Sequence, residues 1–288
     1  MSTENGALAE TAAEMNEDLN GEMNEEDILA TLKLIAERAG KIILAYYVEG
    51  EEIEVRHKDD ASPVTEADEA AETFILGALN TLTPDIPVVA EEAVAGGEIP
   101  VIEGSRFWLV DPLDGTKEFI SRNGEFTVNI ALIEDGQPVA GVVHAPAMAM
   151  TWAGVCGDTE AGGKGPGRAV FANTDQPLMD IRVRKQPHEG AVVVASRRHG
   201  QGQDLEDFLS RYKVAETVSA GSSLKFCLVA SGRADLYPRF GRTMEWDTAA
   251  GHAVLLAAGG QVYTMDDEPL DYGKPGFENP HFYAVGMP

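Results

Sequence analysis

The sequence predicts a mixed fold in which an α+β part precedes an α/β part. Helical patterns and then a group of apolar strands occupy the first part of the chain, whereas strands and helices alternate after about His188. Such alternation favours an α/β arrangement. We therefore expect a disordered acidic tail over residues 1–25, an N-terminal α+β domain over 26–188 and a C-terminal α/β domain over 189–288.

The first 25 residues are acidic and polar and contain no aromatic side chain, which indicates a disordered tail. Between Met1 and Asp27 there are nine Asp or Glu residues and no Lys or Arg, and the formal net charge of the 288-residue chain is −26. An acidic protein is a poor partner for nucleic-acid duplexes and anionic membranes. It can still bind a small anionic substrate where a metal cation sets the local field.

Two amphipathic helices are expected before the strands. The first runs from Glu26 to Tyr47, and the second follows the segment SPVTEAD (62–68). Apolar residues recur every three or four positions in both, which is the pattern of a helix with one buried face. These residues are Leu32, Ile35, Ala36, Ala39, Ile42, Ile43 and Tyr46 in the first helix and Ala71, Phe74, Ile75, Ala78 and Leu79 in the second.

The strands of the first part include two that end in acidic residues, PVVA (87–90) and FWLV (107–110). FTVNIALI (126–133) and PVAGVVHA (138–145) flank an Asp-Gly pair, which predicts a hairpin. A further pair of strands brackets the glycine-rich stretch GDTEAGGKGPG (157–167). That stretch lacks the Gly-Lys-Ser/Thr ending of a phosphate-binding loop, and we interpret it as a mobile hairpin tip.

The second part alternates between the two kinds of element. Its expected strands are AVVVAS (191–196), DLYPRF (235–240), QVYTM (261–265) and FYAVG (282–286). Its expected helices span 204–212, 222–231 and 247–258. The last helix is followed by Gly259 and Gly260, which serve as its C-terminal cap.

Cys156 and Cys227 have apolar neighbours and belong to no CxxC or Cys/His ligand set, so we interpret both as buried free thiols. Free thiols fit a reducing compartment. No apolar run reaches the roughly 18 residues of a membrane span, and the N-terminus lacks the basic-then-apolar order of a signal peptide. We expect a cytoplasmic protein and leave open a peripheral position on the inner face of the cell membrane.

Three acidic clusters are candidates for a metal site: Glu91-Glu92, Asp111 with Asp114, and Asp247. Each has an ordinary explanation, because acids after a strand are commonly solvated, Asp-Gly is a common turn pair and Asp247 fits a helix N-cap. Together they offer at least four carboxylates around one cavity, which suits a hard divalent ion such as Mg²⁺. The sequence has no His/Cys zinc constellation and no Gly-x-Ser-x-Gly elbow.

Two further side chains could activate a water beside these acids. Thr116 follows the Asp-Gly turn and Asp68 ends SPVTEAD. A carboxylate, a hydroxyl and a metal can together deprotonate and aim a water. Thr65-x-x-Asp68 also matches a helix capping box, although that box prefers the longer Glu or Gln at its last position. The local pattern leaves both interpretations of Asp68 open.

Three motifs agree in order and type with one enzyme family: AEE (90–92), WLVDPLDGT (108–116) and WDTAAG (246–251). They resemble the signature of the lithium-sensitive, magnesium-dependent phosphatases of the inositol monophosphatase family, and the resemblance extends from about Glu26 to the C-terminus. Its CysQ-type 3′(2′),5′-bisphosphate nucleotidases are similar over longer segments, namely SPVTEAD, DPLDGTKEFI, RNGEFTVNIALI, GSSLKFCLVASGRADLYPRFG and WDTAAGHAV. The resemblance implies a layered αβαβα sandwich.

The resemblance also implies the metal site. Two or three Mg²⁺ ions would be bound, with Asp111 bridging two of them. The implied ligands are Glu91, Asp111, Asp114, Asp247 and the backbone carbonyl of Leu113. Cations at this place would offset the repulsion between aspartates that lie at one strand end.

Asp68 and Thr116 would, by the same resemblance, orient the attacking water. The loop from Leu113 to Thr116 would cradle the scissile phosphate, because N–H groups after a tight Asp-Gly turn point at an anion near a helix start. The residues implied to contact this end of the substrate are Leu113, Asp114, Gly115, Thr116 and Asp247.

The second phosphate and the nucleoside need other residues. Ser222 and Lys225 lie three apart, which predicts that they share one helix face. Arg239 lies in the YPRF strand. The resemblance implies that these three residues, with His199 in SRRH, bind the non-hydrolysed phosphate and the nucleoside side.

The implied reaction is Mg²⁺-dependent hydrolysis of adenosine 3′,5′-bisphosphate (PAP) to AMP and phosphate by a metal-activated water, with the sulfated form PAPS as a second substrate that would give APS. It would clear a by-product of sulfate assimilation and be sensitive to lithium. An inositol mono- or bisphosphate phosphatase and a non-catalytic nucleotide or metal sensor remain alternatives. Inositol-selective relatives tend to have an acid near the end of the strand before WD, where this chain has Phe240 and Gly241. A monomer and a homodimer are both open.

Overall fold

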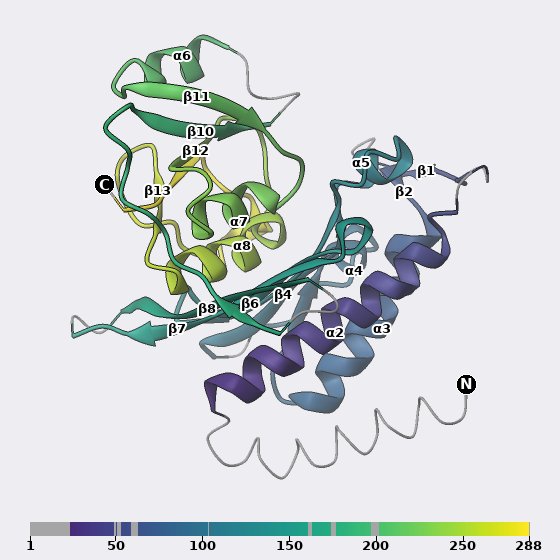
Figure 1. The fold of residues 1–288 in the computed structure, drawn as a ribbon. Coiled ribbons are helices and arrows are strands. Elements are labelled where there is room, and N and C mark those ends of the chain that lie inside the picture. Colours follow the sequence, from purple (N-terminus) through teal and green to yellow (C-terminus); the bar gives the residue numbers. More distant parts are fainter. Residues whose placement is uncertain are drawn as a thin grey trace.

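The computed structural model describes residues 24–48, 50, 53–58, 63–102, 104–160, 163–173, 177–196 and 202–287. They form five layers (Figure 1). In order across the molecule, these are helices α2 (Glu25–Ala45) and α3 (Glu66–Leu82), a seven-stranded sheet, helices α7 (Leu224–Ala230) and α8 (Glu245–Ala257), a five-stranded sheet, and helix α6 (Gln203–Leu209). The predicted layered α+β fold is confirmed. The predicted tail lies outside the described residues as far as residue 23.

The seven-stranded sheet has the order β3-β4-β5-β6-β7-β8-β9. Its strands are β3 (Val88–Ala90), β4 (Arg106–Asp114), β5 (Thr127–Glu134), β6 (Gln137–Ala145), β7 (Met150–Asp158), β8 (Lys164–Asn173) and β9 (Met179–Asp180). Only β3 and β4 pair in parallel within it. Asp135 and Gly136 connect β5 and β6 with φ of 50° and 75°, which confirms the predicted Asp-Gly hairpin.

The five-stranded sheet has the order β11-β10-β12-β14-β13. Its strands are β10 (Ala191–Ala195), β11 (Val214–Ser219), β12 (Leu236–Arg239), β13 (Gln261–Thr264) and β14 (Phe282–Val285). The smaller elements are β1 (Arg56–His57) paired with β2 (Pro63–Val64), the short helices α4 (Glu91–Ala95) and α5 (Thr116–Ile120), and the 3₁₀ turns η1 (Pro146–Met148) and η2 (Pro275–Phe277). The sequence does not predict β11, because this edge strand is exposed along most of its length and carries no apolar pattern.

Two predicted helix starts are wrong in ways that affect the site. Ser222 has φ of 47°, in the left-handed region, so α7 begins only at Leu224 and Ser222 does not share a helix face with Lys225. Asp247 is the third residue of α8, not its N-cap. Its carboxylate accepts a hydrogen bond from the backbone N–H of Met244 at 2.9 Å, because the helix begins two residues earlier than the pattern indicates.

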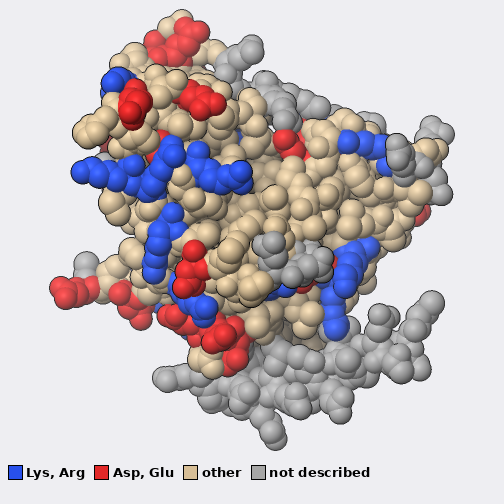
Figure 2. Space-filling view, in the orientation of Figure 1, with Lys and Arg blue, Asp and Glu red and all other residues tan. Residues whose placement is uncertain are grey.

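The surface charge is unevenly distributed on the face shown in Figure 2. A row of Lys and Arg side chains crosses the half that carries the five-stranded sheet, and acidic side chains lie over α6 and toward the β7–β8 hairpin (Figure 2). None of the helices within the described ranges is both long and apolar enough to cross a membrane. Both cysteines are free, with Cys227 buried and Cys156 partly buried.

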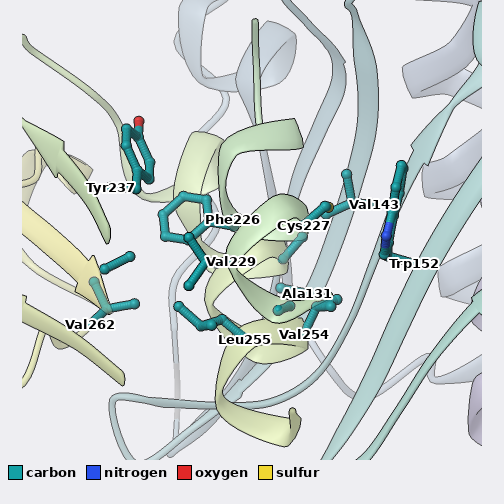
Figure 3. Packing of buried hydrophobic residues seen from close by; sticks show 14 of the residues in the cluster. Ala131, Val143, Trp152, Phe226, Cys227, Val229, Tyr237, Val254, Leu255 and Val262 are labelled. Carbon is teal, nitrogen blue, oxygen red and sulfur yellow. The ribbon is translucent and has the colours of Figure 1, made fainter. Parts of the chain in front are cut away.

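The main hydrophobic core lies between the two sheets, around α7 and α8. Figure 3 shows Phe226, Cys227 and Val229 of α7 between Trp152 of β7 on one side and Val262 of β13 on the other. Helix α8 packs directly on the large sheet, where a Cβ atom on Gly141 would lie 2.8 Å from the Cβ of Ala253. A residue without a side chain therefore sets the close distance between β6 and α8.

Candidate active site

The candidate site forms where two parallel strands end side by side. In the β3–β4 register Ala90 lies opposite Val110, so the next residues, Glu91 and Asp111, emerge at the same edge of the sheet. Helix α8 packs on this sheet and adds Asp247 from its first turn. One carboxylate oxygen from each of Glu91, Asp111 and Asp247 lies within 4.8 Å of the others. Three of the predicted ligands therefore converge from distant parts of the chain.

These carboxylates are costly to ionise together. Asp111 is 1% exposed, and burial, followed by the charges of Glu91, Asp114 and Asp247, raises its pKa well above the usual range. Burial also raises the pKa of Asp247, and that of Asp114 to about 6. A bound cation would remove this penalty. The three atoms that could bind a metal are all carboxylate oxygens, and such a set fits a hard divalent ion.

Asp114 lies beside this group of three but outside it. Its Oδ2 atom accepts hydrogen bonds from the Thr127 hydroxyl and the Asn129 side-chain amide, each at 3.4 Å. The same Asn129 amide donates to Ser223 Oγ at 3.1 Å, and the Ser223 hydroxyl donates to the backbone carbonyl of Asp247 at 2.7 Å. A chain of polar contacts thus joins the turn after β4 to the start of α8.

Local hydrogen bonds hold the turn at the end of β4, residues 113–116. Asp111 Oδ1 accepts a hydrogen bond from the Leu113 N–H at 3.0 Å, and Gly115 has φ of 92° just before α5 begins at Thr116. The Leu113 carbonyl, a predicted ligand, faces the Thr116 hydroxyl, whose Oγ1 is 3.4 Å away. The left-handed backbone conformation at position 115 turns the chain sharply, and glycine adopts this conformation more readily than other residues.

Asp68 and Thr116 are in contact, as the predicted water-activating pair requires. Asp68 is 2% exposed, and its Oδ1 accepts from the Thr116 hydroxyl at 3.2 Å. Its Oδ2 accepts from the backbone N–H and the hydroxyl of Thr65, at 2.8 and 2.6 Å. The capping-box interpretation is therefore confirmed through Oδ2, and the water-activating role stays a prediction for which Oδ1 is in contact with Thr116. Burial is the main cause of a raised pKa for Asp68.

Two residues that the sequence motifs do not indicate, Lys58 and Glu72, support Glu91. Lys58 Nζ donates to Oε1 of Glu91 at 2.6 Å and to Oε1 of Glu92 at 2.7 Å. Glu72, on the buried face of α3, accepts from the backbone N–H groups of Glu92 and Ala93, each at 2.8 Å, and so caps α4. Glu72 follows Asp68 by one helical turn, and this spacing is a usable sequence signal. Lys58 has none, because it lies 33 residues from Glu91.

A pocket of about 190 Å³ adjoins the acidic cluster. Its walls include Asp114, Gly115, Thr248 and three of the predicted substrate residues, Ser222, Lys225 and Arg239. His199, the fourth, lies outside the described residues. The pocket therefore has both acidic and basic side chains in its walls.

Lys225 is buried in this pocket. Burial lowers its pKa to about 8, and the charge of Asp114 opposes that shift. Its Nζ atom lies 5.4 Å from the centre of the Tyr237 ring and donates to the backbone carbonyls of Ser222 and Ala220. Arg239 donates to the carbonyls of Gly241 and Arg242, at 3.3 and 3.1 Å.

Comparisons with known proteins agree on one family. The family model described as "Inositol monophosphatase family" matches residues 24–283. A 3′(2′),5′-bisphosphate nucleotidase CysQ from Escherichia coli (strain K12) is 47% identical over 249 residues, which cover 86% of this chain and 95% of that protein. Its counterpart from Buchnera aphidicola is 39% identical over 259 residues, with coverage of 88% and 91%.

A similar solved structure is that of CysQ from Bacteroides thetaiotaomicron, described as a bacterial member of the same family. It superposes with a TM-score of 0.71 and 35% sequence identity, and covers 90% of this chain and 97% of that one. The inositol monophosphatase from Anabaena gives a TM-score of 0.67 at 25% identity, with 92% of each chain covered.

Proposed function

This chain belongs to the inositol monophosphatase family, and from that premise we propose that it is a 3′(2′),5′-bisphosphate nucleotidase that removes the 3′-phosphate of adenosine 3′,5′-bisphosphate and releases AMP. The observation that carries the proposal is a convergent acidic cluster that adjoins a pocket with a buried lysine and an arginine. The cluster suits the scissile phosphate with its metal ions, and the two cations suit the phosphate that stays on the product.

The metal in this proposal is Mg²⁺, in two or three sites. Glu91, Asp111, Asp114 and Asp247 would hold it, with the carbonyl of Leu113. When bound, Mg²⁺ would supply Lewis acidity and neutralise charge that develops on the phosphoryl group. Lithium sensitivity follows in the proposal from the family resemblance.

Asp68 and Thr116 would orient the attacking water. Thr65 fixes one carboxylate oxygen of Asp68, which leaves Oδ1 aimed at the Thr116 hydroxyl. With its hydrogen engaged by Asp68, Thr116 Oγ1 can accept a hydrogen bond from a water and hold that water for in-line attack. The raised pKa of Asp68 makes its carboxylate a better proton acceptor near neutral pH.

Lys225 and Arg239 would bind the phosphate that is not hydrolysed, and Gly115 and Thr116 would lie against the one that leaves. PAPS, which carries the same 3′-phosphate, would be a second substrate and give APS. The biological role in this proposal is removal of a by-product of sulfate assimilation. We place the reaction in the cytoplasm, where the two unpaired thiols would stay reduced.

An inositol phosphate is less well suited to the pocket. The acid nearest the strand end is Glu245, which is fully buried. Its carboxylate already accepts from the backbone N–H groups of Gly273 and Lys274, at 2.8 and 2.9 Å, and from Lys274 Nζ at 2.7 Å. It is therefore not free to bind sugar hydroxyls, and the cation Arg239 lines the pocket instead.

Phosphate release from adenosine 3′,5′-bisphosphate and from inositol 1-phosphate, each with and without millimolar Mg²⁺, tests the proposal. We expect rapid release from the bisphosphate with Mg²⁺ and little from the other three reactions. Faster hydrolysis of inositol 1-phosphate would replace the substrate assignment. No release from any bisphosphate would favour the third possibility, a sensor that binds without turnover.

A further inference from the structure

Hydrogen bonds hold Gly221 and Ser222 against the turn 113–116 and against Glu125, which lies just before β5. We call this set of contacts the clamp. The Ser222 hydroxyl lies 2.9 Å from the backbone carbonyl of Asp114 and 2.8 Å from that of Glu125. The Gly221 N–H donates to Glu125 Oε2 at 2.7 Å. These contacts join residues that are about a hundred positions apart in the chain and meet beside the acidic cluster.

The chemistry of a hydroxyl limits what Ser222 can do in this position. A serine side chain has one hydrogen to donate, and both of its neighbours here are carbonyl oxygens that only accept. The oxygens of a phosphate are acceptors too. While its hydrogen is directed at Asp114 and Glu125, the Ser222 hydroxyl cannot donate to a substrate phosphate. This argues against the side-chain role that the family resemblance implies for it.

The backbone on both sides is shaped for this contact. Ser222 has φ of 47°, which is uncommon for a residue with a side chain and is kept only where surrounding contacts fix it. Gly115 faces it, and a Cβ atom at that position would lie 2.3 Å from Ser222 Oγ. The absence of a side chain at Gly115 is therefore what lets the hydroxyl reach the Asp114 carbonyl.

We propose that Ser222 is a positioning residue that fixes the turn 113–116 through the carbonyl of Asp114, with Glu125 as the second anchor. The inference rests on the proposed function, because it assigns Asp114 and Thr116 of that turn to metal and water. Ser222 acts on the orientation of those groups and does not contact the substrate through its hydroxyl. Lys225, whose Nζ donates to the Ser222 carbonyl, remains the side chain that binds the second phosphate.

A pair of substrates separates the two roles of Ser222. Adenosine 3′,5′-bisphosphate carries the second phosphate and adenosine 3′-monophosphate lacks it. For Ser222→Ala we expect kcat to fall about tenfold to a hundredfold for both substrates, because a loosened turn misplaces the reacting groups whichever nucleotide is bound. Lys225→Met is the matched comparison, and it should raise KM for the bisphosphate alone.

Two further measurements do not depend on turnover. Calorimetric titration of the metal-free protein should show Mg²⁺ binding weakened about tenfold to a hundredfold in Ser222→Ala, as is typical when a supporting contact to a metal ligand is lost. Amide hydrogen exchange in the metal-free protein should become faster in the peptide that contains residues 113–116. Ser219→Ala, an exposed serine on β11, should change neither value.

Glu125 provides a second test that leaves Ser222 intact. Glu125→Ala removes the acceptor of the Gly221 N–H, whereas Glu125→Gln keeps an oxygen there. We expect Glu125→Ala to reproduce the losses of Ser222→Ala and Glu125→Gln to retain most of the Mg²⁺ affinity. This pair keeps the inference testable if Ser222→Ala does not fold.

The inference is overturned if Ser222→Ala binds Mg²⁺ as tightly as the unmodified protein and only raises KM for the bisphosphate. That result would make Ser222 a substrate ligand. Failure of the unmodified protein to release phosphate from either nucleotide is a different outcome, and it would reject the proposed function itself. The Mg²⁺ titration and the exchange measurement would then still test the clamp.

Discussion

Asp111 is surrounded by other carboxylates and has almost no exposed surface, so its negative charge needs compensation. Asp111→Asn keeps the shape and removes the charge. We expect phosphate release to fall about a hundredfold or more, because a metal ion contributes several kcal/mol to the stabilisation of the transition state. We also expect the metal-free variant to be more stable than the unmodified protein, since the repulsion is relieved. A variant of near-normal activity would contradict the metal assignment.

Lys225 should make substrate capture depend on pH. Its pKa is lowered to about 8 by burial, and the charged groups around it are Asp114, Glu118, Glu125 and Arg239. The ammonium form is therefore lost as the pH rises through about 8, and with it the attraction for the second phosphate. We expect kcat/KM for adenosine 3′,5′-bisphosphate to fall above pH 8 relative to that for adenosine 3′-monophosphate. In Lys225→Met this relative pH dependence should be absent.

Glu72 should act on the metal site without touching a ligand. It caps α4, whose own N-cap residue, Ala90, has no side chain that can accept a hydrogen bond. We expect Glu72→Ala to weaken Mg²⁺ binding about tenfold in a calorimetric titration, because Glu91 is the first residue of that helix. Glu72→Gln keeps one acceptor oxygen and should lose less. Equal Mg²⁺ affinity in the unmodified protein, Glu72→Ala and Glu72→Gln would show that the cap does not position Glu91.

Single side chains also show what sequence reasoning can reach. The motifs identify Asp111, Asp114, Asp247 and Asp68 as candidate site residues, because the spacing and neighbours of each can be recognised within one short segment of sequence. The partners of these residues are not local. Lys58 and Asn129 reach the site only through the pairing of strands and the packing of helices. The sequence around each residue does not predict its contact with the site.

At the level of helices and strands, the most testable contact is that between β6 and α8. Gly141→Ala would place a Cβ 2.8 Å from that of Ala253 and 3.0 Å from the Ala250 carbonyl. We expect it to lower the free energy of unfolding by about 2 kcal/mol, since neither the sheet nor the helix can move away freely.

A matched glycine on α3 serves as the control for that substitution. Gly77 lies in the helix interior, and a Cβ there would meet nothing within 4 Å. Gly77→Ala should raise the free energy of unfolding by about 0.5–1 kcal/mol, because alanine loses less backbone entropy in a helix. Denaturant titrations measure both changes. Equal effects of the two substitutions would contradict the close packing of α8 on β6.

Elements with a strong period or a clear turn signal were predictable. The long helices α2 and α3 and the Asp-Gly hairpin are examples, because local propensity and burial agree there. Helix α7 shows the limit, since its predicted start includes Ser222, which tertiary hydrogen bonds hold in a left-handed conformation. The parallel pairing of β3 with β4 brings Glu91 to Asp111. This pairing depends on the tertiary fold and cannot be predicted from either segment alone. The domain division at residue 188 stays a prediction.

For the molecule as a whole, the gathered acids make stability depend on metal and pH. The folded pKa of Asp114 is about 6, above its usual value, and those of Asp111 and Asp247 are raised as well. Groups with a raised folded pKa stabilise the fold fully below their unfolded pKa, near 4. Without metal, that contribution is lost as the pH rises through about 6 for Asp114, and higher for groups raised further.

We therefore expect Mg²⁺ to raise the melting temperature at pH 7.5 by about 5 °C when present at a hundred times its dissociation constant. At pH 5 the increase should be smaller, because protonated carboxylates bind metal poorly. Melting curves in EDTA and in Mg²⁺ at the two pH values measure this. Identical melting temperatures with and without Mg²⁺ at pH 7.5 would contradict a divalent site, and Asp111→Asn should show little response to the ion.

The position of α8 has a consequence for how the chain is made. Ala131, Val143 and Trp152 lie on the face of the large sheet that α7 and α8 cover (Figure 3). These two helices are synthesised after all the strands of that sheet. At typical synthesis rates the final hundred residues take roughly 5 to 20 seconds, during which a nascent chain bears this bare apolar surface. A truncated product that stops near residue 188 should therefore aggregate or recruit chaperones, and a separately supplied C-terminal fragment should rescue it.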